Sequence, residues 1–264
     1  MGRWCAGAVR LQLQGVSRLF DFLDQYNIRA RLFPAVLAIA PALAFALLAV
    51  SWNQLGLTET LTTLAVMVLF FGFSDLARRF GKRIEPSIFA ALGGKPSVSI
   101  LRYDDPTLDP MTKARYRNFL GASIGETPPT AESERQRPEE ADAFYERCGN
   151  WLRENTRSKS FKILFEENIT YGFRRNLYGL KWPGLLLNAA IVLLCLVVLD
   201  QGGTPFTLSS IVHAKIFPVI VIAAIHAFYF AVWVRKKPVM AAAKQYARQL
   251  ILSCEGLMAE AGRR

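Results

Sequence analysis

The chain has 264 residues, of which 52% are hydrophobic and 20% are charged, and its formal net charge is +11. This length suits one medium domain or a membrane unit with a small soluble part. The positive charge excess lies mostly beside apolar blocks, which favours anionic lipid over nucleic acid as its partner. The four cysteines include no CxxC pair, which argues against zinc sites and a disulfide scaffold.

Residues 1–32 precede the first apolar block and are predicted to form a cytoplasmic amphipathic helix. Apolar side chains recur there in steps of three and four, as one helical stripe requires. The stripe consists of Val9, Leu13, Val16, Phe20 and Leu23. Several arginines precede the first block, so a cleavable signal peptide is not expected.

Four apolar segments follow, and each is long enough to form a transmembrane helix. They are residues 33–52, 58–74, 184–199 and 216–234. A hydrocarbon core of about 30 Å needs about twenty helical residues, and the second and third segments are near the lower limit. The sequence therefore predicts an all-α integral membrane protein with two transmembrane hairpins, at 33–76 and 182–234.

The distribution of Lys and Arg predicts the orientation of these hairpins. Both residue types are absent from 32–77 and from 182–214, and they gather at the opposite ends of the spans. By the positive-inside rule, both termini and the segment between the hairpins are expected to be cytoplasmic. The abundance of Ala, Leu, Arg and Gly suits a multi-pass protein of the bacterial inner membrane. The residues expected to contact anionic lipid or an anionic ligand are Arg78, Arg79, Lys82, Arg83, Arg174, Arg175, Arg235, Lys236 and Lys237.

Residues 77–181 are predicted to form a cytoplasmic, mainly helical domain. The helix of the second span should continue into it until the Gly-Gly-Lys-Pro sequence at 93–96. Apolar and polar residues alternate over 97–103, which predicts one short strand or an extended loop. Asp109 is a capping residue followed by proline, so a helix should begin there and stop at Gly121.

Two more helices are expected after a loop at residues 124–137 that is rich in Pro, Thr, Glu and Arg. Pro138 opens the first, with acidic residues near its positive end. The second brings the chain back to the membrane. Their apolar stripes are Ala141, Tyr145, Cys148 and Leu152 in the first and Phe161, Phe165, Ile169, Phe173 and Leu177 in the second.

Residues 235–264 are predicted to form a cytoplasmic C-terminal helix with a heptad-like apolar seam. The seam consists of Met240, Ala243, Ala247, Leu250, Cys254, Leu257 and Ala261. One interpretation is a helix packed on its own domain. The other is a helix that joins the subunits of a homo-oligomer.

Two polar residues lie deep in the predicted spans. His226 is near the middle of the fourth span, and Asn188 is the only amide deep in the third. An ionisable residue at this depth is a functional candidate. His226 is interpreted either as a neutral side chain bonded between helices or as a residue that lines or gates a pore. Pro34 and Pro41 of the first span free backbone carbonyls and can kink it.

Enzymatic motifs are scarce, so neither catalytic residues nor a cofactor is expected. Asp104, Asp105 and Asp109 could form a hard-metal cluster. Asp105 and Asp109 each precede a proline, however, and are better explained as turn or cap residues. Two basic clusters are either solvated faces or a site for an acidic partner or nucleotide-like ligand. They are Lys113, Arg115 and Arg117 with Tyr116, and Arg153, Arg157 and Lys159.

The layout of four spans with a cytoplasmic spacer resembles the small four-transmembrane effector proteins of bacterial anti-phage systems. The resemblance implies a non-enzymatic effector, silent until a partner or small signal triggers oligomerisation and membrane permeabilisation. The expected partners are the lipid bilayer, further copies of the chain, and a cytoplasmic protein or an acidic small molecule. The alternative is a membrane scaffold that recruits a cytoplasmic partner complex.

Overall fold

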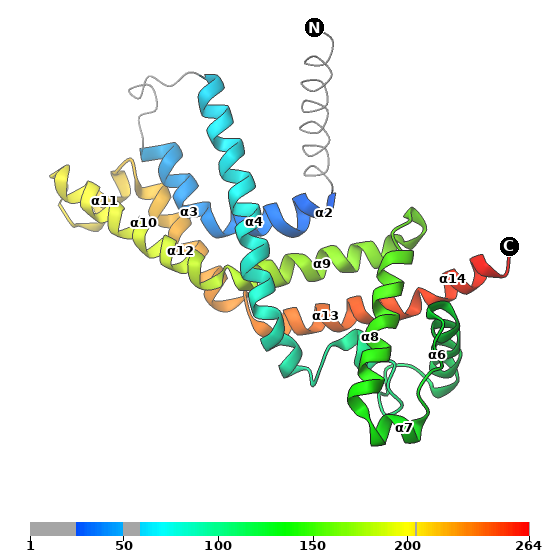
Figure 1. Cartoon of the computed structure of the whole chain (residues 1–264). Coiled ribbons are helices and arrows are strands. Elements are labelled where there is room, and N and C mark those ends of the chain that lie inside the picture. The colour runs from blue at the N-terminus through cyan, green and yellow to red at the C-terminus, as the bar shows by residue number, and fades with distance from the viewer. Residues whose placement is uncertain (1–24, 50–58, 204, 264) are drawn as a thin grey trace, which may run out of the picture. The chain divides into compact units, whose positions relative to one another are not determined.

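A computed structural model describes residues 25–49, 59–203 and 205–263 (Figure 1). Every regular element among these residues is helical, and this part of the chain contains no strand. The chain forms two compact units. Unit 1 combines the described residues up to Ile84 with Gly172–Arg235, and unit 2 combines Glu85–Tyr171 with Lys236–Arg264. The C-terminal segment, which the sequence treats separately, therefore belongs to the same unit as the central segment.

Unit 1 is built around three helices that pack on one another, α3, α10 and α12. Its elements are α2 (Gln25–Asn27), η1 (Ile28–Leu32), α3 (Phe33–Ala49), α10 (Lys181–Gln201), α11 (Leu208–His213) and α12 (Phe217–Val232), with parts of α4 (Glu59–Ala91) and α9 (Lys162–Gly179). Ala35, Ala38 and Phe230 are among its buried residues. Small side chains on α3 allow the neighbouring helices to approach closely, as in helix packing within membranes.

Two helices of the described chain are long and apolar enough to cross a membrane. They are Gln25–Leu48, with 24 residues, and Lys181–Gln201, with 21 residues. The helix Phe217–Val232 meets the same criteria only together with the bent helix that follows it. The turn of the first predicted hairpin and the start of the second span, at 50–58, lie outside the described residues, as does most of the predicted N-terminal helix.

Unit 2 is built around α8, which packs on α5, α6, α7 and α13. Its elements are α5 (Pro96–Ser99), α6 (Pro110–Ile124), α7 (Ala131–Gln136), α8 (Pro138–Asn155), η3 (Lys159–Phe161), α13 (Lys236–Leu252) and α14 (Cys254–Ala261), with the remaining parts of α4 and α9. The stripe predicted for α8 is confirmed, because Ala141, Tyr145, Cys148 and Leu152 are all buried in the core of this unit.

The predicted start of α6 is confirmed, whereas its predicted end is wrong. Asp109 accepts a hydrogen bond from the Thr112 amide at 2.9 Å, as an N-cap does. The helix continues past Gly121 to Ile124, and Gly125 supplies the left-handed cap with φ of 72°. Gly121 has a different role: a Cβ there would lie 2.7 Å from the Glu126 carbonyl oxygen, so glycine lets the next loop pack closely.

Two segments differ from the sequence-based expectation. Residues 97–103 form neither a strand nor an extended loop: α5 makes one helical turn after Pro96, and bends follow it. A lone strand has no partner for its backbone groups, whereas proline suits a first helical turn. The predicted loop at 124–137 contains α7, whose N-cap Thr130 accepts from the Ser133 amide at 3.1 Å.

Candidate functional site

The three packed helices of unit 1 meet around His226 of α12. The side chain is 6% exposed, and its ring stacks on Phe230 with centroids 4.3 Å apart. It faces the backbone of Leu37 and Ala38 in α3. Pro41 has no N–H group, so α3 supplies no donor four residues along for the Leu37 carbonyl. The imidazole therefore lies beside backbone that the proline leaves incompletely bonded.

Both ring nitrogens of His226 are buried near the backbone of Leu37 and Ala38, but among the described residues neither makes a hydrogen bond of standard geometry. Asn188 of α10 is also buried, and its Nδ2 donates to the Ala223 carbonyl oxygen at 2.9 Å, one turn before His226 on α12. Its Oδ1 has no partner in the described part of the chain. The structure thus brings together the two polar candidates of the predicted spans, and both remain incompletely satisfied.

This arrangement is costly in a resting protein. A buried polar group without a hydrogen bond costs about 1–3 kcal/mol by protein mutational data. Water, a proton or a shift of α3 can supply the missing partner of His226. Both interpretations of His226, as a side chain bonded between helices and as a residue of a pore, stay predictions.

Asn176 of α9 donates a hydrogen bond to a second backbone carbonyl that a proline leaves without a donor. Pro34 has no N–H for the Ala30 carbonyl, and η1 widens there into a π-helical turn. Asn176 Nδ2 donates to that carbonyl at 2.6 Å, and its Oδ1 accepts from Arg175 Nε at 3.2 Å. Gly81 of α4 makes room, because a Cβ there would lie 2.0 Å from Asn176 Oδ1. Sequence reasoning did not single out Asn176, although Pro34 predicted a free carbonyl.

Most of the predicted anion-contacting residues are exposed, with two exceptions. Arg175 is 7% exposed, and Lys236 is partly buried, with its Nζ donating to Ser87 Oγ at 3.1 Å. Arg79 is exposed and pairs with Asp75 at 2.6 Å. The exposed members of the set are Arg78, Arg79, Lys82, Arg83, Arg174, Arg235 and Lys237.

In unit 2, Lys113 holds the segment between α5 and α6. Only 2% of the residue is exposed, and its Nζ donates to the carbonyl oxygens of Arg102, Tyr103 and Asp105 at 2.7, 3.1 and 2.6 Å. Desolvation lowers the pKa of this ammonium group. Arg117, also buried, lies with its guanidinium carbon 3.7 Å from the Tyr103 ring centroid. These two cations are engaged within the protein.

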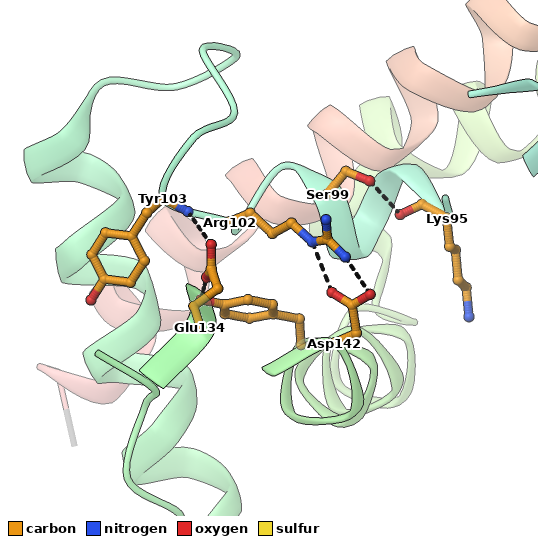
Figure 2. A network of polar contacts seen from close by, with 7 residues as sticks. Lys95, Ser99, Arg102, Tyr103, Glu134 and Asp142 are labelled. Carbon is orange, nitrogen blue, oxygen red and sulfur yellow. Dashed lines mark hydrogen bonds and ion pairs between the residues drawn. The ribbon is translucent and has the colours of Figure 1, made fainter. Parts of the chain in front are cut away.

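Figure 2 shows the carboxylates that complete this network. Both oxygens of Asp142 accept from Arg102, with Nε to Oδ1 at 2.8 Å. The two oxygens of Glu134 accept from the Tyr103 amide at 3.0 Å and from the Tyr145 hydroxyl at 2.6 Å. Burial, followed by the hydrogen bond to Glu134, raises the pKa of Tyr145. The network joins the segment that follows α5 to α7 and α8 within unit 2.

Three further basic residues of these clusters, Arg115, Arg153 and Arg157, also have partners, whereas the side chain of Lys159 lies outside the described part of the chain. Arg115 and the Tyr116 hydroxyl both donate to Glu255, the latter at 2.7 Å, and so join α6 to α14. Arg153 and Arg157 bond to side chains three residues earlier on α8 at 2.7 Å. These internal contacts do not favour the interpretation of the clusters as a ligand site.

The C-terminal seam packs inside unit 2. Ala243, Ala247, Leu250 and Cys254 are buried, Met240 and Leu257 are partly buried, and Ala261 is exposed. This matches the interpretation of a helix packed on its own domain, so the middle of the seam offers no surface to another subunit. Burial raises the pKa of the Cys254 thiol to about 12.

The predicted turn and cap carboxylates act as such. Asp105 Oδ1 accepts from the Thr107 amide at 2.8 Å, and Asp109 caps α6. Among the described residues, no group of three or more His, Cys, Asp or Glu side chains is placed to hold a metal ion. Comparison with known proteins gives no match, neither to a family model nor to a curated protein or solved structure.

Proposed function

We propose that this chain is a non-enzymatic, oligomeric inner-membrane protein that acts as a pore-type effector and is controlled through unit 2. One observation carries the proposal. A chain with two candidate membrane helices also forms a polar helical unit with many internal hydrogen bonds. The helices α4 and α9 each begin in one unit and end in the other. Continuous helices allow a change in the polar unit to reach the apolar one.

Unit 1 has the surface that a lipid-facing protein requires. Large apolar side chains of α10 and α12 are exposed, with Trp182 at 71%, Leu186 at 70% and Ile225 at 64%. Exposed apolar surface on this scale marks contact with lipid or other subunits. Four spans with both termini in the cytoplasm complete the proposed topology, and the basic residues at the span ends support it.

The composition of unit 1 favours a resting state that does not conduct. Its buried polar groups are few, and no charged side chain of the described α12 lies in its apolar stretch. A water-filled path therefore requires several subunits or a rearrangement of α3, α10 and α12. Such a rearrangement would give the unsatisfied polar atoms of His226 and Asn188 hydrogen-bond partners, which would stabilise the rearranged state.

Dye-filled vesicles containing increasing amounts of the purified full-length protein test this proposal. We expect leakage that rises more steeply than protein density, because assembly precedes permeation. His226→Leu should reduce leakage, whereas His213→Leu, the same change at an exposed position in α11, should not. A protein that inserts, remains monomeric by light scattering and releases no dye at any density contradicts the effector proposal.

A membrane scaffold is the second candidate, and a groove in unit 2 favours it. The groove has a volume of about 400 Å³ and lies between the α5 region and α13. Lys244 and Arg248 line it beside Asp105 and Ser99, so it suits a mainly acidic peptide. Insertion without leakage, together with partner binding that Arg248→Glu abolishes, would support this function.

A further inference from the structure

The exposed face of α13 carries a row of cations. Lys237, Lys244 and Arg248 follow one another in steps of seven and four residues, so they lie on one face of the helix. All three are exposed, and so is Ala241, which lies between them on that face. The buried seam occupies the other face. The polar face of α13 is therefore basic over a length of about 16 Å.

These cations differ from most others in unit 2 because they have no internal partner. Most Lys and Arg side chains of this unit donate to an oxygen of another residue, as Lys95 does to Glu146 at 2.6 Å. Within the part of unit 2 that the structure describes, the side chains without such a bond are Lys162, Lys237, Lys244 and Arg248. A row of like charges without counter-ions attracts an anionic partner.

A groove beside this face distinguishes it from an ordinary solvated surface. Its volume of about 400 Å³ lies within the range of ligand sites, roughly 300–1,000 Å³. On the side of α13 it is lined by Ala241, Lys244, Gln245 and Arg248. The opposite side combines apolar side chains with hydroxyl groups, from Leu92, Pro96, Ser99, Ile100 and Thr107. A ligand in this groove therefore meets two cations and an apolar wall together.

The layout favours a protein segment over a phosphate ion or a bilayer. Cations spread over about 16 Å of helix cannot all contact one phosphate group. A flat bilayer does not enter a groove, and the Asp105 carboxylate that lines it repels anionic headgroups. A carboxylate accepts hydrogen bonds, so Asp105 suits a peptide, whose backbone supplies N–H donors. An acidic peptide satisfies the cations, the acceptor and the apolar wall.

We propose that the basic face of α13 and the groove beside it dock an acidic segment of a partner protein. Its acidic side chains pair with Lys244 and Arg248 in the groove and with Lys237 beyond it. An apolar side chain of the same segment packs against Leu92 and Ile100. The inference rests on the proposed control through unit 2, and it names the partner class that exerts this control.

Fluorescence anisotropy with a labelled peptide, Glu-Glu-Leu-Glu-Glu-Leu, tests the docking surface. The full-length protein is held in nanodiscs of phosphatidylcholine. We expect Lys244→Gln to weaken peptide binding about fivefold, because an exposed ion pair is worth up to that factor. Lys162→Gln removes an exposed, unpartnered cation of α9 and should leave binding unchanged. Ala241→Trp should fill the groove and weaken binding. Unchanged melting temperatures show that these surface variants are folded.

Three controls identify the occupant. The peptide Gln-Gln-Leu-Gln-Gln-Leu should bind much more weakly than the acidic peptide. Millimolar inorganic phosphate should not displace the acidic peptide, and nanodiscs that contain phosphatidylglycerol should still bind it. Equal effects of Lys244→Gln and Lys162→Gln, or equal binding of the two peptides, would overturn the proposal. Displacement by phosphate, or loss of binding in the anionic nanodiscs, would assign the face to phosphate or to lipid instead.

The binding assay also separates this inference from the effector proposal. Peptide binding that depends on Lys244 supports the docking surface even if the protein releases no dye from vesicles. Dye leakage from a protein that does not bind the acidic peptide overturns the docking surface and leaves the effector proposal intact.

Discussion

The two units satisfy their buried polar groups in opposite ways. In unit 2, the buried Lys113 has three carbonyl partners. In unit 1, His226, Asn188 and Arg31 each retain at least one buried polar atom without a partner. Every such atom found in the described part of the chain belongs to unit 1.

This difference indicates which unit is complete by itself. A fully bonded polar network rigidifies a core and specifies one structure. Buried polar groups without a protein partner mark sites of bound water or ions, strain or function. Unit 2 therefore suits a stable control domain, and unit 1 suits the part that responds to lipid, to other subunits or to a trigger.

The strongest way to break unit 2 is to remove the ammonium group of Lys113. Lys113→Met leaves three carbonyl oxygens without their donor, and we expect a loss of about 3–5 kcal/mol in the free energy of unfolding. Arg115→Met removes an exposed pair with Glu255 and should cost at most about 1 kcal/mol. Chemical denaturation of the full-length protein measures both. Equal costs would show that the carbonyl contacts of Lys113 contribute little.

In unit 1, the close crossing of α4 and α9 is the most sensitive feature. A Cβ on Gly179 would lie 2.6 Å from the backbone carbon of Phe80. Gly179→Ala should therefore force the helices apart and destabilise by about 1–3 kcal/mol. Gly72→Ala meets nothing within 4 Å and should stabilise α4 slightly. Melting temperatures in detergent test this pair, and similar values for both variants would refute the close crossing.

The seam of α13 and α14 provides a test by chemical labelling. Buried Cys254, whose thiol pKa is raised to about 12, should react slowly with iodoacetamide in the native protein. Cysteine at the exposed position of the same helix, in Glu260→Cys, should react rapidly. Mass spectrometry of labelled peptides compares the two rates. Rapid labelling of Cys254 without unfolding would show that unit 2 leaves the seam uncovered.

Acid should weaken unit 2 through Glu126. A hydrogen bond from Arg147 holds the pKa of Glu126 below its ordinary value of 4.5. The pair therefore stabilises the folded state above that value, and its contribution is lost as the pH falls through the folded pKa. Glu126→Gln should flatten the acid dependence of the melting temperature, and Arg147→Met should do the same. An unchanged slope in both variants would exclude this pair as a cause.

The smallest expected effect on stability concerns His226. His226→Leu replaces two unsatisfied ring nitrogens by apolar atoms, so the free energy of unfolding should stay within about 1 kcal/mol of the native value or rise. Asn188→Leu also loses the bond to Ala223 and should be the less stable variant. Denaturation in detergent compares them. A large loss in His226→Leu would indicate a structural bond that is absent from this conformation.

Local chemistry made much of the fold predictable from the sequence. The Asp109 cap, the stripe of α8 and the helix break before Pro96 depend on neighbouring residues, and the structure agrees with each. Contacts between distant segments were not predictable. Periodicity shows that Leu250 lies on an apolar face that must be buried, but not whether its own chain or another subunit buries it. Gly121 resembles a helix stop until the packing of the next loop is known.

The candidate sites follow the same division. Composition and depth single out His226 and Asn188, and the missing N–H of Pro34 and Pro41 is evident in the sequence. Which side chain lies beside each backbone carbonyl that these prolines leave free depends on tertiary packing. The role of Asn176 therefore appears only in the structure. Arg175 looks like its exposed neighbours in the sequence, yet it is buried.

The most direct test of the account is the side of the membrane on which each unit lies. Gly202→Cys, at the end of α10, and Glu139→Cys, in α8, place exposed thiols in the two units. In bacterial spheroplasts, a membrane-impermeant maleimide should label Gly202→Cys directly and Glu139→Cys only after permeabilisation. Labelling of both without permeabilisation, or of neither until the membrane is opened, would contradict a membrane unit with a cytoplasmic control domain.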